Sequence, residues 1–277
     1  MFASAELPLA IFTTLAPIGA GGFVGLAALL FAGAIGEDKY KKADIVALVA
    51  LILTCVGFLA STMHVANAGH IMGAFSGIGS SPMSNEVVCG IVFVVVAAIY
   101  VILAWTGKLA AGARKGFAAV VAVVGIVFMI MTAMAYMIAT VATWNSVLTI
   151  AEILGIGITG AAAFAALTLV MTDEGSAAKS TVMALAVIGA VLGVIGVIGI
   201  AVVASGTASY VVEGGAVVSS NMVAIVASII CFVAAAALSI IGRSSTLAGA
   251  AVVLAVVAGL AARCAFYGMM ISVGLAL

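Results

Sequence analysis

The sequence predicts an all-α integral membrane protein, a bundle of about eight transmembrane helices. Of its 277 residues, 67% are hydrophobic and only 6% are charged, whereas a soluble domain carries about 25% charged residues. The apolar runs reach about 20 residues, the length that an α-helix needs to cross a bilayer core. They are continuous and do not alternate, which favours helices over a β-barrel. The net charge of zero, without a basic patch, argues against a nucleic-acid partner.

Polar breaks divide the chain into eight expected spans, which we assign to a single transmembrane anchor domain, residues 1–277. No positively charged segment precedes the first apolar run, so we expect that run to be a span and not a cleaved signal peptide. The spans are Leu9–Ile35, Asp44–Val65, Glu86–Thr106, Phe117–Ala139, Val147–Met171, Thr181–Ala204, Ser219–Ile241 and Leu247–Val273.

Basic residues fall in alternate connections between these spans. The second, fourth and sixth connections contain none, and only Arg263 lies inside a span. The positive-inside rule therefore predicts that the odd connections are cytoplasmic and that both termini lie outside. We expect a multi-pass membrane protein with this orientation. The basic residues of the odd connections are Lys39, Lys41, Lys42, Lys108, Arg114, Lys115, Lys179 and Arg243.

Two further patterns are interpreted as membrane packing. Trp105 and Trp144 lie near predicted span ends, where tryptophan anchors helices at the interface. The stretch Gly155–Gly160 reads GIGITG and matches a dinucleotide-binding motif, but it lies in an apolar span without a preceding strand. Glycines at three- or four-residue spacing, such as Gly21 with Gly25, allow helix backbones to approach closely in lipid.

The sequence gives no reason to expect a metal centre in this chain. The four cysteines are scattered and form no C-x-x-C pair, whereas zinc and iron–sulfur sites need clustered thiolates. A haem held between helices would use two facing histidines, but His64 and His70 belong to one short stretch. We therefore expect no haem or iron–sulfur cluster here.

Four ionisable residues are predicted to meet in the outer half of the bundle. His64 ends the second span, Glu86 opens the third, Glu152 lies in the fifth and Arg263 in the eighth. Ionisable groups inside a membrane are costly and commonly functional. With the predicted topology, three lie near outer helix ends and Arg263 lies about 15 Å from its outer end, at 1.5 Å per residue. These groups are our candidate site.

Each residue also has a structural interpretation. His64 could bond the carbonyl groups at a helix end, and Glu86 could favour the positive start of its helix. Glu152 and Arg263 could form a structural ion pair, and this is the interpretation that we favour for them. His70, in the connection, is expected to be solvated.

A histidine and a carboxylate beside an apolar interior suit the oxidation of a quinol. A quinol loses two protons and two electrons, and a neutral imidazole can accept a hydroxyl proton. A nearby carboxylate can orient the imidazole or pass the proton to water. The electrons must go to a partner with redox cofactors on the outer face, and the uncharged connection Ala66–Asn85 is the expected docking platform.

Several segments, in the same order along the whole chain, resemble the membrane-anchor subunits of bacterial dimethyl sulfoxide reductases (the DmsC family). After the histidine, the family usually reads Leu-Gly-x-Pro, whereas Val65–Ala68 lacks the glycine and the proline. The similar segments are ELPLAIFTTLAPIGAGGF, GFLASTMHVANAGHIMGAF followed by SNEVVCG, TWNS at Thr143–Ser146, and RCAFYGMMISVG at Arg263–Gly274.

The resemblance implies an anchor for a molybdopterin catalytic subunit and a four-cluster iron–sulfur subunit in anaerobic respiration. It also implies that His64 and Glu86 bind menaquinol and take part in its oxidation. Arg263 matches a family arginine, and we regard it, with Glu152, as a possible supporting residue. The terminal electron acceptor would be set by the catalytic subunit.

We therefore predict a menaquinol-oxidising anchor subunit without a redox cofactor of its own. Three alternatives stay open at this point. A secondary transporter could use Glu152 and Arg263 as a relay near the midplane, although inverted repeats are not evident. A purely structural anchor would have no quinol site. An anchor of the related polysulfide or nitrite reductase type would change the partner more than the mechanism.

Overall fold

The computed structural model describes residues 6–63, 73, 75–174, 178–209 and 212–272. Over these ranges the chain is helical, and the only β-pairing is in two isolated bridges. Eight helices are long and apolar enough to cross a membrane, which confirms the predicted fold class. The elements are α1 (Leu7–Phe31), the 3-10 turn η2 (Glu37–Lys39), α2 (Tyr40–Thr62), α3 (Pro82–Trp105), α4 (Ala111–Ala135), α5 (Val147–Met171), α6 (Lys179–Ser205), α7 (Gly214–Ser220), α8 (Met222–Ile241) and α9 (Ser245–Gly268).

Most helix bounds lie within a few residues of the predicted ones, and α5 has the same bounds. The start of α5 is fixed by Ser146, whose hydroxyl accepts a hydrogen bond from the Leu148 amide at 3.2 Å. The seventh predicted span is divided, because the short helix α7 precedes α8 and Asn221 separates them. The Asn221 side chain donates to the Val217 carbonyl at 2.9 Å, at the end of α7. The last helix ends at Gly268, earlier than predicted.

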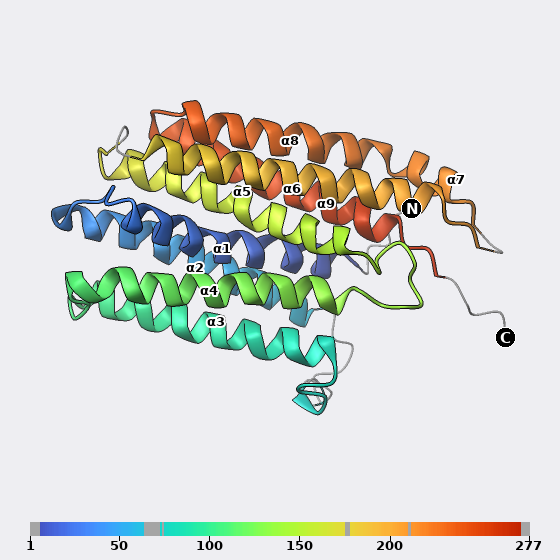
Figure 1. Ribbon diagram of the computed structural model, residues 1–277, viewed down its shortest axis with the longest axis horizontal. Helices are drawn as coiled ribbons and strands as arrows, with labels where there is room; N and C mark the ends of the chain where they lie inside the picture. The colour runs from blue at the N-terminus through green and yellow to red at the C-terminus, as the bar shows by residue number, and fades with distance from the viewer. Residues whose placement is uncertain (1–5, 64–72, 74, 175–177, 210–211, 273–277) are drawn as a thin grey trace.

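The long helices lie side by side along one axis (Figure 1). At one end of the bundle are the connections from α1 to α2, α3 to α4, α5 to α6 and α8 to α9. We call this the basic end, because every lysine and arginine except Arg263 lies at or near it. The start of α1, the end of α9 and the short α7 lie at the opposite end, which we call the far end. The side of the membrane that each end faces stays a prediction.

Helices α1 and α5 occupy the centre and are packed through small residues. A Cβ atom on Gly21 would meet the Gly157 carbonyl of α5, and one on Gly25 would meet the Ala161 carbonyl. On the other side of α5, a Cβ on Gly196 of α6 would lie 2.6 Å from the Cα of Glu152. These contacts confirm that the glycine motifs serve helix packing.

The two tryptophans have different environments. Trp105 is 61% exposed, as expected of an interfacial anchor. Trp144 is only 6% exposed. Its ring stacks on that of Phe266 at 4.8 Å, and its indole N–H donates to the Phe266 carbonyl at 3.0 Å. The interpretation of Trp144 as an interfacial anchor is therefore wrong, because the connection after α4 folds it onto the end of α9.

Candidate functional site at the far end

The described part of the chain includes three of the four predicted site residues. Glu86, Glu152 and Arg263 are all buried, with exposed fractions of 7%, 0% and 0%. His64, and also His70, lie outside the described residues, as do residues 66–72 and 74 of the predicted docking connection; its other twelve residues are described. Helix α2, which leads to His64, ends at Thr62 at the far end.

Arg263 and Glu152 form the ion pair that the sequence predicted. Arg263 Nη1 lies 3.4 Å from Glu152 Oε2, joining α9 to α5. Arg263 Nε also donates to the Thr13 hydroxyl of α1 at 2.9 Å. Arg263 is five residues from the end of α9, or about 8 Å at 1.5 Å per residue, so it lies nearer to the far end than the predicted 15 Å.

Aromatic rings surround the Arg263 guanidinium. Its central carbon lies 3.7 Å from the centre of the Phe266 ring, and 4.9 Å from those of Tyr136 and Tyr267. The Tyr267 hydroxyl donates to the Tyr136 hydroxyl at 2.7 Å. Such contacts stabilise a cation that is shielded from water. Sequence reasoning missed these rings, although Phe266 and Tyr267 follow Arg263 at the three- and four-residue spacing that shares a helix face.

Glu86 lies in the second turn of α3, and Thr132 of α4 lies beside it. Electrostatic interactions connect the Glu86 carboxyl with Arg263 and with Tyr136. Its Oε1 atom is buried and has no hydrogen-bond partner among the described residues, and the same holds for Glu152 Oε1 and Arg263 Nη2. Buried polar atoms are normally satisfied. Three such atoms on three ionisable side chains therefore mark a place with unused bonding capacity.

Phenylalanine rings from α1, α2 and α4 form an apolar floor next to these polar groups. The Phe58 ring lies 5.0 Å from that of Phe12 and 5.5 Å from that of Phe128. A Cβ on Gly90, one turn after Glu86, would contact both Phe58 and Phe128. The floor thus lies one turn deeper than Glu86, and its member Phe58 lies on the helix that leads to His64. Apolar walls with a few polar groups are typical of ligand sites.

A second buried ion pair lies at the basic end, remote from this site. Arg114 Nη1 donates to Asp44 Oδ1 at 2.5 Å and to the Tyr100 hydroxyl at 3.3 Å. Its guanidinium carbon lies 4.3 Å from the centre of the Tyr40 ring. The sequence placed Arg114 in a connection, which is wrong, because α4 begins at Ala111. Arg263 is therefore not the only basic residue within a span.

The far end combines an apolar surface with buried polar groups that have unused bonding capacity. The floor offers apolar contact, while Glu86 and Glu152 offer carboxyl oxygens and Arg263 offers a donor. No group of three or more metal-binding side chains gathers among the residues that the structure describes.

Comparison with known proteins gives the family. The family model described as "DMSO reductase anchor subunit (DmsC)" matches residues 1–269. Over 148 residues the protein is 30% identical to a subunit of the anaerobic dimethyl sulfoxide reductase of Haemophilus influenzae, a match that covers 52% of this chain and 51% of that relative. Over 145 residues it is 28% identical to the corresponding subunit of Escherichia coli K12, covering 52% and 50%.

A third relative, the YnfH subunit of an anaerobic dimethyl sulfoxide reductase of E. coli K12, is 26% identical over 156 residues, 56% of this chain and 55% of the relative. The matches with these curated relatives thus span about half of their length. The family model extends over nearly the whole chain, and the eight apolar helices agree with a membrane anchor. The chain therefore belongs to the DmsC family of DMSO reductase anchor subunits, as a multi-pass protein of the bacterial inner membrane.

Proposed function

We propose that this chain binds and oxidises menaquinol at the far end of the bundle. It would then pass the electrons to an iron–sulfur partner subunit, which supplies a molybdopterin catalytic subunit in anaerobic respiration. Family membership supports the role of anchor. The observation that carries the quinol site is the buried Glu86 carboxyl, whose Oε1 atom has no partner among the described residues and lies next to the phenylalanine floor.

His64 and Glu86 have complementary roles in this proposal. One quinol hydroxyl transfers its proton to the His64 imidazole, whose ordinary pKa is close to neutral. Glu86 accepts a hydrogen bond from the quinol or from the imidazole and helps the second proton to reach water. Oxidation releases two protons and two electrons for each quinol, and the naphthalene ring system of menaquinol rests on the phenylalanine floor.

Arg263 and Glu152 support the site without taking a proton from the quinol. The Arg263 guanidinium interacts electrostatically with Glu86, so it favours the ionised form of the carboxyl. Glu152 and the aromatic rings hold Arg263 in place, at 3.4 Å and at 3.7 to 4.9 Å respectively. Arg263 is thus a positioning residue in the proposed mechanism.

The electrons leave the anchor at the far end. The partner subunit would dock there, on the connection between α2 and α3 that follows His64. Because the sequence predicts that this end faces outward, protons and electrons would be released on the same side. Quinol oxidation would then move no net charge across the membrane.

Quinol-driven and dye-driven activities of the assembled complex test the proposal. His64→Ala and Glu86→Gln should each lower quinol-dependent reduction of the acceptor by about 100-fold, the usual loss for a group that transfers protons. Dye-driven reduction bypasses the anchor and should not change. Glu213→Gln is the matched control, because Glu213 is exposed at the same end of the bundle. Wild-type quinol oxidation in both site variants would refute the assignment.

A further inference from the structure

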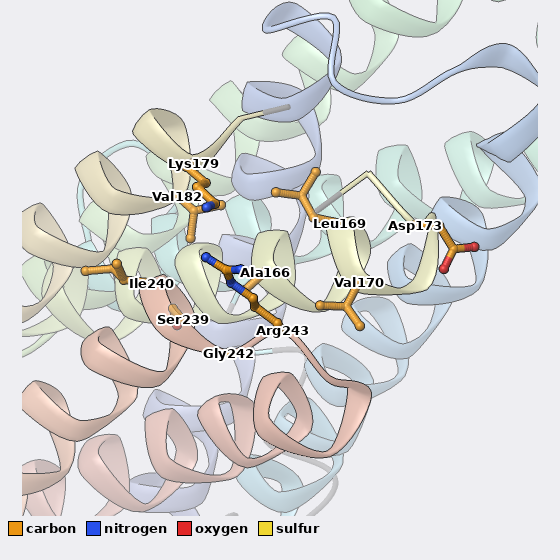
Figure 2. A pocket seen from close by; sticks show the side chains of 10 residues that line it. All are labelled: Ala166, Leu169, Val170, Asp173, Lys179, Val182, Ser239, Ile240, Gly242 and Arg243. Atoms are coloured by element: carbon orange, nitrogen blue, oxygen red, sulfur yellow. The ribbon is translucent and has the colours of Figure 1, made fainter. Parts of the chain in front are cut away.

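A cavity of about 320 Å³ lies at the basic end of the bundle, between α5, α6 and the end of α8. It is independent of the proposed quinol site, which lies at the far end. Apolar and basic side chains both contribute to its wall, and Figure 2 shows them. The apolar part includes Leu169, Val170, Val182 and Ile240, and the basic part is formed by Lys179 and Arg243.

The two basic side chains face the same space. Lys179 is the first residue of α6, and Arg243 follows the end of α8 by two residues. Both side chains extend into the cavity (Figure 2). Neither forms an ion pair with any residue that the structure describes. Two like charges on one small space repel each other, so the cavity favours a bound anion.

The acidic residue in the cavity wall does not neutralise these cations. The Asp173 carboxylate accepts a hydrogen bond from Lys42 at 3.0 Å. This hydrogen bond and the charge of Lys42 lower the pKa of the Asp173 carboxyl. In Figure 2 the carboxylate points away from Lys179 and Arg243. The charge of Asp173 is thus directed to α2 and not to the cavity.

The start of α6 adds to the attraction for an anion. Its N-cap residue, Ala178, provides no side-chain hydrogen bond to the first turn. The first amide groups of a helix carry the positive end of its dipole. The same dipole opposes a lysine at the first helical position. A bound anion would offset this unfavourable placement of Lys179.

We propose that the cavity binds the phosphodiester headgroup of an anionic membrane phospholipid. The cavity lies at helix ends, where the headgroups of a bilayer lie, and its apolar part suits the glycerol and the first acyl carbons. Exposed apolar side chains beside it, Met183 at 50% and Ile241 at 63%, continue the apolar surface toward the lipid. Basic pockets between transmembrane helices on the cytoplasmic side are known to bind such headgroups. Inorganic phosphate would leave the apolar part uncovered.

Lipid binding by the full-length protein, measured by native mass spectrometry in detergent, tests the proposal. Phosphatidylglycerol should bind in preference to phosphatidylcholine with the same acyl chains. The double variant Lys179→Gln/Arg243→Gln should bind phosphatidylglycerol about 25-fold more weakly, at about fivefold for each basic residue. The matched control is Lys108→Gln/Lys115→Gln, which removes the same charge from exposed positions at the same end. It should bind as the wild type does, because separated surface charges are screened.

Each other outcome would refute part of the proposal. If the two double variants weakened phosphatidylglycerol binding equally, the binding would depend on the overall charge of the protein and not on this cavity. Equal binding of phosphatidylglycerol and phosphatidylcholine would exclude an anion site. Displacement of the lipid by millimolar glycerol phosphate or inorganic phosphate would assign the cavity to a small soluble oxyanion and not to a lipid.

Discussion

Two buried arginines, one at each end of the bundle, are paired in different ways. At the basic end, Arg114 donates to both Asp44 and Tyr100, and its Nε is buried without a partner among the described residues. At the far end, Arg263 meets Glu152 at a longer distance, 3.4 Å. One oxygen of Glu152, one of Glu86 and one nitrogen of Arg263 have no partner among the described residues.

In the proposed function, this difference distinguishes a structural contact at the basic end from a binding site at the far end. A buried polar atom without a partner costs about 1–3 kcal/mol, so a protein that needed only stability would satisfy it or replace it. The Asp44–Arg114 pair joins α2 to α4 and, among the described residues, leaves no buried oxygen of Asp44 without a partner. In the proposed function, the unpaired atoms at the far end serve a molecule that enters from outside; ionisable groups inside membranes are commonly functional.

The largest expected effect is on stability at the basic end. Asp44→Leu leaves the Arg114 guanidinium buried without its anion and should lower the free energy of unfolding by about 3–5 kcal/mol. Reversible unfolding in mixed detergent micelles measures this loss. Quinol turnover per folded complex should stay at the wild-type rate. The double variant Asp44→Leu/Arg114→Met should recover most of the stability, because no charge is left unpaired. A double variant as unstable as the single one would contradict the structural role of the pair.

A smaller loss is expected where α6 presses against the Glu152 backbone. Gly196→Ala introduces a Cβ atom 2.6 Å from the Glu152 Cα, and overpacking of this kind costs about 1–3 kcal/mol. Gly249→Ala is the control. A Cβ atom there would meet nothing within 4 Å beyond the adjoining backbone of its own helix, so this variant should gain about 0.5–1 kcal/mol of stability. The same unfolding experiment compares the two. A Gly196→Ala variant as stable as the wild type would mean that α5 and α6 are not in close contact at this position.

Glu86→Gln should change stability by less than about 1 kcal/mol, since Oε1 loses no hydrogen bond within the described structure. This result would contrast with that of Asp44→Leu, although both changes remove a buried carboxylate. Thermal melting of the purified complex, with the quinol pool removed, is the measurement. A loss comparable to that of Asp44→Leu would place Glu86 among the structural residues.

The smallest effect is expected for an exposed ion pair. Lys42 Nζ lies 3.0 Å from Asp173 Oδ2, with both side chains exposed, and exposed pairs contribute little. Lys42→Gln should leave the melting temperature at neutral pH unchanged. The Asp173 pKa is lowered from its ordinary value of 3.8, so any contribution is present above that pH and is lost as the pH falls below it. A marked destabilisation at neutral pH would contradict the distinction between buried and exposed pairs.

The fold was predictable because the spans are long and apolar. The bounds of α5 agree with the prediction because a serine cap and the end of the apolar run mark them. The division between α7 and α8 was not predictable from the apolar pattern. Asn221 lies at the division and packs so closely against Gly268 of α9 that a Cβ atom there would meet its side chain. The neighbours of Trp144 are likewise far away in the sequence, with Phe266 122 positions later.

The candidate site was predictable in part. The rarity of charge within spans singles out Glu86, Glu152 and Arg263, and the structure brings them to one end of the bundle. The Arg263–Thr13 bond joins residues 250 positions apart, and no local pattern indicates it. The Asp44–Arg114 pair was missed because each residue lies beside lysines that mark the ends of spans, and only the helix register turns both side chains inward.

Direct binding of a short-chain menaquinol analogue to the purified protein tests the central claim most directly. Calorimetric titration should give an affinity at least tenfold weaker for Glu86→Gln than for the wild type, since a hydrogen bond to a charged group contributes about 1.5–3 kcal/mol. The double variant Asp44→Leu/Arg114→Met should bind the analogue as the wild type does. Equal affinity in the wild type and Glu86→Gln would contradict the claim that the unpaired groups at the far end form the quinol site.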